Sequence, residues 1–586
     1  MPTTAEPSTT HGSTQDRLLH AMLGRYTLGL SPAALALAFE DWLTHLALAP
    51  GKQQELVDKA LRKLHRFVLY AAHAAHAARG PCPACIEPLP QDTRFAHAHW
   101  QRWPFNLVYQ AFLFNQQWWY NATTEVHGVS PHHEQVVTFV MRQLLDMMAP
   151  SNFVATNPEV LAQTARTGGM NLLQGFQNWW NDAERLAAGR RPEGVEAYTP
   201  GRDVAVTPGK VVYRNRLIEL IQYSPAHASA AKSVHPEPLL IVPSWIMKYY
   251  ILDLSPGNSL VRYLVAQGHT VFMISWKNPD QNDRGLGMHD YLKMGVMDAI
   301  EAVSAVTQAR GMHGVGYCLG GTLLAIAAAA MAREHDTRLK TLTLLASELD
   351  FKDPGELSLF MDESQVAWLE DIMWDRGYLD GQQMAGAFTL LNSKDLVWSR
   401  MVRDYLMGRR RPLNDLMAWN ADATRLPSRM HSEYLRRLYL GNDLAEGRYK
   451  VDGRPIALSD IRVPVFAVAT QRDHVSPWRS VYKIHLLTDT EVTFLLASGG
   501  HNAGIVSEPG HAHRSYQAAR RTGNERYLDP EAWVAATLVQ EGSWWPEWQR
   551  WLASHSGKRA APPAMGAPAR GYAVLADAPG AYVLAG

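Results

Sequence analysis

The chain has 586 residues, of which 47% are hydrophobic and 10% aromatic, and this length predicts more than one folding unit. Its 56 Lys and Arg side chains balance its 56 Asp and Glu side chains. Because there is no long basic run either, nucleic acid is not an expected partner.

Cysteine is scarce in this chain: only Cys82, Cys85 and Cys318 occur. Three cysteines cannot form a disulfide framework, and their number is typical of a protein of the reducing cytosol. Residues 1–12 are polar and rich in Thr and Ser, unlike a signal peptide. No uninterrupted apolar run reaches the length of a membrane span. We therefore expect a cytoplasmic protein without a transmembrane segment.

The N-terminal third of the chain has helical periodicity and few strand-like alternations. The clearest predicted helices span residues 35–48, 53–78, 103–120 and 133–148. A break rich in Gly, Arg and Pro over residues 189–194 ends this region. We predict a helical N-terminal domain over residues 1–195.

After residue 195, short apolar runs bounded by turn residues alternate with helical patterns. Strands are predicted over residues 204–206, 211–213, 217–223, 238–245, 269–276, 339–345, 463–469 and 492–496, and helices over 259–267 and 288–310. Short, continuously apolar runs are typical of buried parallel strands. Their alternation with helices predicts a doubly wound α/β sheet.

One long region interrupts this alternation. Residues 351–442 are rich in Met, Trp, Leu and Arg and predict an irregular helical insertion, which is typical of a cap or lid over a catalytic site. The predicted catalytic core is therefore discontinuous and comprises residues 196–350 and 443–557. Residues 558–586 are rich in Ala, Pro and Gly, and we predict an extended C-terminal tail.

Cys318 occupies the nucleophile position of a G-x-nucleophile-x-G pattern between Gly316 and Gly320. A strand-like stretch precedes it, and the strongly helix-forming residues 322–331 follow it. Strand, tight turn and helix in this order are the context of the nucleophile elbow of the α/β-hydrolase fold, here with cysteine in place of serine. The helix start behind the sulfur would stabilise a thiolate. The alternative is a buried structural cysteine at a strand–helix junction.

A nucleophile of this kind needs a base, and the base needs an orienting acid. In the α/β-hydrolase fold both follow the nucleophile, each in a loop after a strand. Asp473 follows the strand over 463–469, and His501 follows the strand over 492–496. We predict that His501 is the base and that Asp473 orients it. His474 is a competing base, but its adjacency to Asp473 makes the geometry awkward.

Taken singly, an aspartate in such a loop is commonly a turn cap and a histidine is commonly a surface residue. Their order after the cysteine, each behind a predicted strand, favours the catalytic interpretation. The oxyanion hole is predicted from the backbone amides of Leu319 and Ile246. Ile246 lies in the Pro243-Ser-Trp-Ile loop, where this fold has its first oxyanion donor.

Several motifs together resemble one enzyme family. They are Asp41–Gln54, Pro150–Pro158, Val242–Leu254, Asn258–Leu264, Ile274–Asn278, Gly316–Gly320, Trp419–Pro427, Asp473–His474 and Gly500–Gly504. Through these motifs the chain resembles the polyhydroxyalkanoate synthases over nearly its whole length, in particular the single-subunit class I enzymes. The resemblance implies polymerisation of (R)-3-hydroxyacyl-CoA, with 3-hydroxybutyryl-CoA as the favoured substrate, into polyester with release of CoA.

The resemblance also implies roles for matched residues. Cys318 would carry the acyl group, His501 would be the base, and Asp473 would be its partner or would help to activate the incoming hydroxyl. Trp419 and Tyr439 fall in motifs near the cap and the substrate channel. An acyltransferase of this family is expected to form a homodimer, to associate with polyester granules in the cytoplasm, and to need no metal or tightly bound cofactor.

Two positions depart from the family pattern. Trp245 stands beside the predicted oxyanion loop where many members have a smaller residue, and it would narrow the acyl pocket. Asn502 replaces the usual aliphatic residue after the histidine. The departure at Trp245 does not affect the expected chemistry.

His73, His76, Cys82 and Cys85 have the residue types of a zinc site. No second Cys-x-x-Cys pair supports a metal site, so we favour a structural interpretation.

Two other functions are compatible with parts of the pattern. A thioesterase or an intracellular depolymerase would use the same three residues, but the helical N-terminal half and the insertion argue against it. A granule-surface binding protein would keep the fold without catalysis. The complete set of Cys318, Asp473 and His501 argues against that interpretation.

Overall fold

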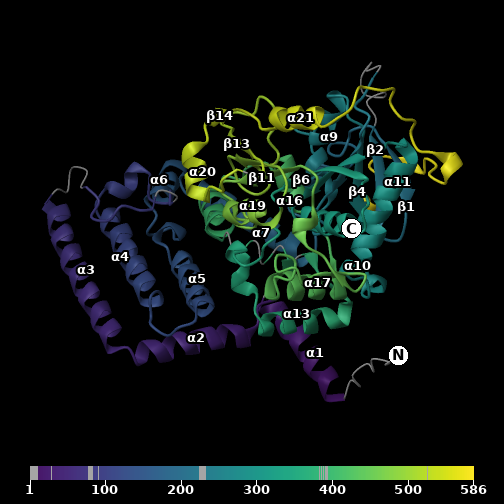
Figure 1. Ribbon diagram of the computed structural model, residues 1–586. Coiled ribbons are helices and arrows are strands. Elements are labelled where there is room, and N and C mark those ends of the chain that lie inside the picture. The colour runs from purple at the N-terminus through teal and green to yellow at the C-terminus, as the bar shows by residue number, and fades with distance from the viewer. Residues whose placement is uncertain are drawn as a thin grey trace. The chain divides into compact units, whose positions relative to one another are not determined.

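The structure is a computed structural model that describes residues 11–27, 29–76, 83–89, 92–223, 233–381, 383–384, 386, 389, 393–523 and 525–585. The described residues form two compact units (Figure 1). The first unit contains the described parts of Met1–Tyr26, Gly194–Met384 and Leu413–Gly586. The second contains those of Thr27–Glu193 and Ala385–Pro412.

A mixed sheet of 11 described strands forms the centre of the first unit. In spatial order the strands are β14 (Val539–Glu541), β13 (Ser515–Arg521), β12 (Val492–Ala497), β11 (Val465–Thr470), β6 (Leu339–Leu345), β5 (Met312–Tyr317), β3 (Leu239–Val242), β4 (Val271–Trp276), β2 (Ile218–Tyr223), β1 (Lys210–Arg214) and β15 (Ala576–Asp577). The strands from β12 to β4 are parallel, and antiparallel strands extend both edges. The predicted α/β-hydrolase architecture is confirmed.

Helices cover both faces of this sheet. The chain passes from β3 outward to β4 and then crosses back over β3 to β5, and such crossovers are right-handed. The helix α9 (Leu260–Ala266) therefore lies on one face, and α11 (Asp298–Thr307) and α12 (Leu319–Arg333) lie on the other. This reversal puts the carboxyl ends of β3 and β5 at the switch point, where open α/β sheets bind their ligands.

The helix α21 (Trp545–Ser554) packs on the same face as α9, because the Tyr263 and Trp545 rings lie 5.4 Å apart. The remaining short elements of the first unit are η3 (Val195–Ala197), η4 (Tyr249–Asp253), η5 (Gln281–Asp283), α10 (Met288–Asp290), η6 (Tyr291–Met297), β9 (Lys450–Val451), β10 (Arg454–Pro455), η11 (Leu458–Asp460), α18 (Trp478–Tyr482), α19 (Ile484–Leu487), α20 (Pro530–Ala536), η12 (Pro568–Arg570) and η13 (Tyr582–Leu584).

The predicted helical insertion lies between β6 and β11. Its part in the first unit comprises η7 (Gly355–Phe360), α13 (Glu363–Arg376), β7 (Tyr378–Leu379), α16 (Asp415–Asn420), β8 (Leu426–Pro427), α17 (Ser428–Tyr434) and η10 (Leu435–Leu440). The helix α13 packs against α17 and against α1 (His11–Tyr26) (Figure 1). The described residues of Ala385–Pro412 belong to the second unit. The predicted insertion over residues 351–442 is therefore divided between the two compact units.

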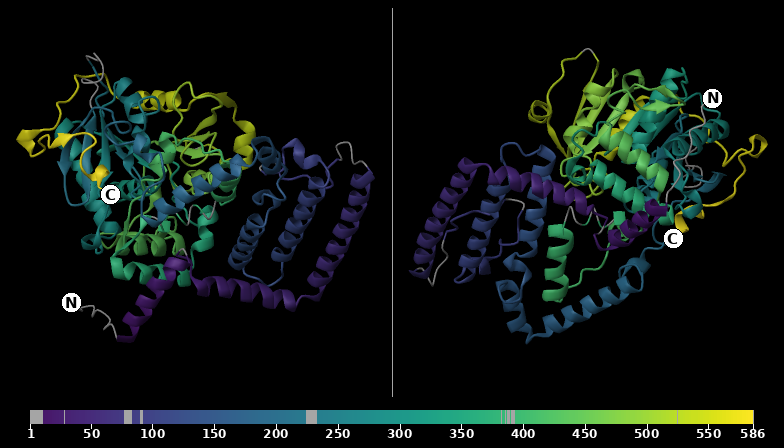
Figure 2. Two further views of the ribbon diagram at one scale, coloured as in Figure 1. Left: turned by 180° about the vertical axis from the view of Figure 1, so that it is seen from behind. Right: turned by 90° about the horizontal axis from the view of Figure 1, so that it is seen from below.

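The second unit is helical. Its elements are α2 (Pro32–Ala47), α3 (Pro50–His76), η1 (Ala98–Gln101), α4 (Phe105–Thr123), α5 (Pro131–Met147), η2 (Pro150–Asn152), α6 (Pro158–Thr167), α7 (Met170–Ala187), η8 (Lys394–Trp398), α15 (Ser399–Met401) and η9 (Val402–Leu406). Figure 2 shows α3, α4 and α5 side by side. Ser31, Ser130 and Asn157 cap α2, α5 and α6, each followed by proline in the first turn, which sets where these helices begin.

The C-terminal segment differs from the predicted extended tail. Its strand β15 pairs with β1 at the edge of the sheet. The buried Glu219 carboxylate accepts the backbone N–H groups of Ala581 and Tyr582 at 2.9 and 2.8 Å. Val583 is buried as well. The Ala/Pro/Gly-rich composition could not predict these contacts, because they depend on the acceptor Glu219, which is distant in the sequence. Residues 204–206 also differ from the prediction, since Val204 forms only an isolated bridge.

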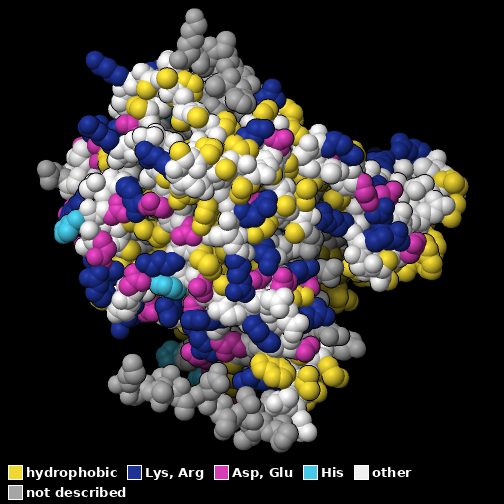
Figure 3. All heavy atoms as spheres, turned by 90° about the vertical axis from the view of Figure 1, so that its right-hand side faces the viewer, with side chains coloured by type: hydrophobic (Ala, Val, Ile, Leu, Met, Phe, Trp, Pro, Cys, Tyr) yellow, Lys and Arg dark blue, Asp and Glu magenta, His cyan; other side chains and the backbone are white. Residues whose placement is uncertain are grey.

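None of the helices in the described ranges is long and apolar enough to cross a membrane. On the face drawn in Figure 3, Lys and Arg side chains are interleaved with Asp and Glu.

Candidate active site

Cys318 lies in a sharp turn between β5 and α12, with φ of 53° and ψ of −127°. This left-handed backbone is unusual for a residue with a side chain. The flanking glycines make the turn possible: a Cβ on Gly316 would lie 2.2 Å from Cα of Gly321, and a Cβ on Gly320 would lie 2.1 Å from the carbonyl oxygen of Val242. The turn has the strand–turn–helix form of a nucleophile elbow.

Cys318 is mostly buried, and 7% of its surface remains exposed to solvent. Its amide donates to the carbonyl of Leu345 on β6 at 2.9 Å, which fixes the elbow to the neighbouring strand. The 15-residue helix α12 begins at Leu319, and its N-terminus favours negative charge on the adjacent sulfur.

Asp473 follows β11, and its side chain is fully buried. It accepts hydrogen bonds from the amides of Val475 at 2.9 Å and Ser476 at 2.8 Å, from the Thr470 hydroxyl at 3.0 Å, and from Nδ1 of His501 at 2.8 Å. Burial alone would raise the pKa of this carboxyl. The charge of His501 and these hydrogen bonds outweigh burial and hold the pKa below its ordinary value. Asp473 is therefore a carboxylate.

His501 follows β12, and 14% of its side chain is exposed. Burial opposes a charged imidazole, but Asp473 and then Cys318 raise the pKa of His501 well above its ordinary value through charge and hydrogen bonding. Because Nδ1 is hydrogen-bonded to Asp473, Nε2 is the nitrogen that can exchange a proton with the Cys318 sulfur. His474 is exposed, so it lacks the surroundings of a catalytic base. The structure thus brings together Cys318, Asp473 and His501 from the loops after β5, β11 and β12.

One predicted oxyanion donor, Leu319, lies in the elbow, and the other, Ile246, lies in the loop after β3. Leu319 is the first residue of α12. The amide of Ile246, in the loop after β3, donates to the Ser244 hydroxyl at 3.4 Å. That loop runs beside the elbow, because Gly320 packs against the backbone of Pro243.

Tyr439 interacts electrostatically with Cys318, whereas Trp419 contacts the loop after β3. Burial, then the charges of Glu348 and Cys318, raise the pKa of Tyr439, whose ring centroid is 4.9 Å from that of Phe351. Trp419 is buried on α16, and its Nε1 donates to the carbonyl of Lys248 at 2.7 Å.

Glu348 and Tyr434 also interact with this region, although the sequence gave no functional signal at either position: Glu348 follows the strand β6, and Tyr434 ends the helix α17. Glu348 follows β6, is 3% exposed, and has an Oε1 without a hydrogen-bond partner among the described residues. Burial raises the pKa of Glu348 well above its ordinary value. Tyr434 has its pKa raised by burial and by Tyr439, with Cys318 and Glu348 contributing. Trp245 packs against Tyr434, with ring centroids 6.1 Å apart.

The sequence does not predict a zinc site at His73, His76, Cys82 and Cys85, although the residue types would suit one. Cys82 lies outside the described residues. In the described ranges no three His, Cys, Asp or Glu side chains gather as a metal site. The amides of Cys85 and Ile86 instead donate to Oε1 of Gln110 at 3.0 and 2.8 Å, a structural contact.

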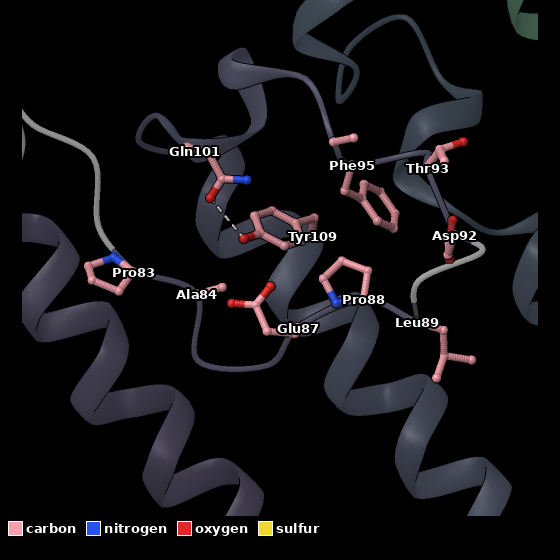
Figure 4. A pocket seen from close by; sticks show the side chains of 11 residues that line it. Pro83, Ala84, Glu87, Pro88, Leu89, Asp92, Thr93, Phe95, Gln101 and Tyr109 are labelled. Carbon is pink, nitrogen blue, oxygen red and sulfur yellow. Dashed lines mark hydrogen bonds between the residues drawn. The ribbon is translucent and has the colours of Figure 1, made fainter.

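A separate cavity of about 590 Å³ lies in the helical second unit (Figure 4). Its lining residues are Pro83, Ala84, Glu87, Pro88, Leu89, Asp92, Thr93, Phe95, Ala96, Gln101 and Tyr109. In Figure 4 the Tyr109 hydroxyl points to Gln101, with a hydrogen bond of 3.1 Å. None of the predicted site residues lines this cavity.

Comparison with known proteins places the chain in a family. A family model described as "Poly-beta-hydroxybutyrate polymerase (PhaC) N-terminus" matches residues 91–264, and one described as "Poly-beta-hydroxybutyrate polymerase N terminal" matches residues 12–52. The chain is 42% identical over 504 residues to the poly(3-hydroxyalkanoate) polymerase of Methylorubrum extorquens, covering 85% of this chain and 81% of the relative. The chain belongs to the poly(3-hydroxyalkanoate) polymerase family.

Other members of this polymerase family are similar over comparable lengths. The enzyme subunit of Rhizobium etli is 38% identical over 85% of this chain and 78% of its own length. That of Cupriavidus necator is 35% identical over 93% of this chain and 90% of its own length. A model of the α/β-hydrolase fold matches residues 237–508, the region that contains Cys318, Asp473 and His501.

Proposed function

We propose that this chain polymerises (R)-3-hydroxyacyl-CoA into polyester and releases CoA, with Cys318 carrying the acyl chain. The observation that supports this most directly is the arrangement of Cys318, His501 and Asp473 in a member of the poly(3-hydroxyalkanoate) polymerase family. The class I pattern of the motifs favours short acyl groups, with 3-hydroxybutyryl-CoA as the preferred substrate.

The first step loads the acyl group. The Cys318 thiolate attacks the thioester carbonyl, a new carbon–sulfur bond forms, and the oxyanion is stabilised by the amides of Leu319 and Ile246. The bond to the CoA sulfur then breaks, and the departing thiolate takes the proton held on Nε2 of His501. One thioester replaces another, so the chain remains activated. A serine ester would lose that activation.

The second step lengthens the chain. Neutral His501 removes the proton from the 3-hydroxyl of an incoming substrate, and the oxygen attacks the acyl-Cys318 carbonyl. The bond to the cysteine sulfur breaks, and an ester joins the chain to the new CoA thioester. Cys318 then attacks that thioester and expels CoA, which restores the acyl enzyme with one more unit. Conversion of a thioester to an oxoester in each cycle drives growth.

Asp473 holds the imidazole in this cycle. Its hydrogen bond of 2.8 Å to Nδ1 fixes the ring orientation and stabilises the positive charge. Asp473 would also help to activate the incoming hydroxyl through the same imidazole. No metal or tightly bound cofactor enters either step.

Water must be excluded, because hydrolysis would release the chain. The aromatic side chains around Cys318, among them Tyr434, Tyr439 and Trp245, supply an apolar wall. We assign the 351–442 insertion the role of a cap and place Trp419 and Tyr439 along the substrate channel. The working enzyme is a class I homodimer, and it associates with polyester granules in the cytoplasm.

The deciding experiment incubates purified protein with (R)-3-hydroxybutyryl-CoA and measures free CoA and insoluble polyester together. A polymerase yields both in matching amounts. CoA release with soluble hydroxyacid alone would identify a thioesterase instead. Cys85, a partly buried cysteine in the helical second unit, serves as the matched control position, since Cys85→Ala should keep wild-type yields while Cys318→Ala yields neither product.

A further inference from the structure

One hydrogen bond joins the residue before the cysteine to the residue after the histidine. The hydroxyl of Tyr317 donates to Oδ1 of Asn502 at 2.5 Å. Tyr317 is the last residue of β5 and adjoins Cys318, and Asn502 adjoins His501 in the loop after β12. The bond spans 185 residues of sequence and connects the two catalytic loops directly.

The surroundings of Tyr317 make it a firm donor. Its side chain is buried, and its ring centroid lies 5.8 Å from that of His501. Burial, and then the negative charges of Cys318 and Asp473, raise the pKa of Tyr317 well above its ordinary value, so the phenol keeps its proton. Loss of the acceptor would leave a buried hydroxyl without a hydrogen bond, which is unfavourable.

The acceptor is held equally firmly. The backbone carbonyl of Asn502 accepts the Ile505 amide at 3.1 Å. Two buried indoles fix the same loop: Nε1 of Trp544 donates to the Gly504 carbonyl at 2.9 Å, and Nε1 of Trp545 donates to the Ile505 carbonyl at 3.0 Å. These bonds hold the loop that carries Asn502 in place, so the side-chain oxygen of Asn502 offers the Tyr317 hydroxyl an acceptor on a fixed backbone.

We propose that Tyr317 and Asn502 form a positioning pair that sets His501 against Cys318. An aliphatic side chain at position 502 would offer no acceptor to the Tyr317 hydroxyl, so this bond depends on the asparagine. In the proposed polymerase cycle, on which the catalytic part of this inference rests, the imidazole serves first the sulfur and then an incoming hydroxyl. A shift of about 1 Å in such a group lowers rates by roughly 100-fold. Neither residue touches the reacting atoms, so both act through His501.

The test compares Tyr317→Phe, Asn502→Leu and the double variant in the full chain. The first readout needs no acyl-CoA: it is the rate at which iodoacetamide alkylates Cys318 at about pH 6 and at about pH 9. A loosened imidazolium supports the thiolate less, so each single variant should react roughly 3- to 10-fold more slowly at the lower pH. At the higher pH, where ordinary thiols ionise without help, the rates should match the wild type. The neighbouring ionisable groups, unchanged in all variants, are His501, Asp473, Glu348, Tyr434 and Tyr439.

The second readout is CoA release from 3-hydroxybutyryl-CoA. In each single variant kcat should fall about tenfold with little change in KM, because positioning and not substrate binding is lost. The double variant should resemble either single variant, since both remove the same bond.

Tyr516→Phe is the matched control. Tyr516 is also buried on the sheet, and its hydroxyl donates to Oε1 of Gln540 on β14 at 3.0 Å, so this bond includes no residue of the loops that carry Cys318 and His501. It should keep the wild-type alkylation ratio and kcat.

Single variants with wild-type alkylation and kcat, or effects that add in the double variant, would overturn the pairing. If Tyr317→Phe does not fold, as judged by circular dichroism, Asn502→Leu decides alone. If the wild type makes no polyester but alkylation still responds to both substitutions, the positioning pair stands and the polymerase proposal fails.

Discussion

Trp419 donates its indole N–H to the backbone carbonyl of Lys248 at 2.7 Å, and this bond joins the insertion to the loop that follows β3. The Lys248 ammonium donates in turn to the carbonyls of Val583 at 2.9 Å and Ala585 at 2.5 Å. Lys248 is 4% exposed. A buried lysine thus connects the loop carrying Ile246, the predicted channel residue Trp419 and the C-terminal segment.

Deletion of residues 576–586 should destabilise the first unit by about 3–5 kcal/mol, because it removes two carbonyl acceptors of a buried ammonium. The thermal unfolding midpoint measures this effect. Lys248→Met in the shortened chain should recover part of the loss, since it removes the buried charge that has lost these two acceptors. A shortened chain that unfolds at the wild-type temperature would show that these contacts contribute nothing.

Cys318→Ser should fold normally yet lose nearly all turnover, on the order of 1,000-fold or more, because serine cannot form the thioester that keeps the chain activated. CoA release and polyester yield measure activity, and circular dichroism confirms folding. Polymerisation at the wild-type rate would remove Cys318 from the nucleophile role.

Asp473→Asn should lower kcat by roughly 1,000- to 10,000-fold, because an amide leaves the imidazole in the wrong tautomer. Loss of the carboxylate also lowers the pKa of His501, which Asp473 raises in the wild type. Alkylation of Cys318 near neutral pH should therefore slow as well. Asp489→Asn, at an exposed aspartate in another loop, is the control and should leave both rates unchanged.

Two buried histidines predict a loss of stability in acid. Burial lowers the pKa of His269 to about 2 and that of His313 to about 4. The unfolded chain takes up these protons below about pH 6.5, whereas the folded protein resists them. The free energy of unfolding should thus be intact above about pH 6.5 and fall steadily below it. His269→Leu should flatten this fall in denaturant titrations at several pH values, and an unchanged slope would contradict the assignment.

Glu348 should give the opposite trend. Burial raises its folded-state pKa well above its ordinary value, so the unfolded carboxyl ionises first as the pH rises above about 4.3. This residue therefore costs stability at neutral pH. Glu348→Gln keeps the shape without the charge, and its unfolding midpoint should exceed that of the wild type at about pH 7.5 and match it at about pH 4. Equal midpoints at both pH values would contradict a buried neutral acid.

The positions of Cys318, Asp473 and His501 could be predicted because each follows a short apolar strand, and parallel strands end at one edge of a sheet. The helices α2 to α5 could be predicted within a few residues from their periodicity. Contacts between distant segments could not. The pairing of β15 with β1 and the burial of Lys248 depend on partners more than 300 residues away. The sequence does not distinguish Glu348 from other residues that follow a strand. The hydrogen bond from Tyr317 to Asn502 could not be predicted, because it depends on how two loops distant in the sequence lie in the fold.

The left-handed conformation of Cys318 lowers the stability of the fold, although the proposed chemistry needs a side chain at this position. Any residue with a β-carbon is disfavoured at this φ, whereas glycine adopts it freely. Selection for thermal stability alone would favour glycine at position 318, and the protein would then lack the nucleophilic thiol. Comparison of inactive Cys318→Gly and Cys318→Ala proteins would isolate this conflict, with the glycine form melting higher by the equivalent of about 1 kcal/mol.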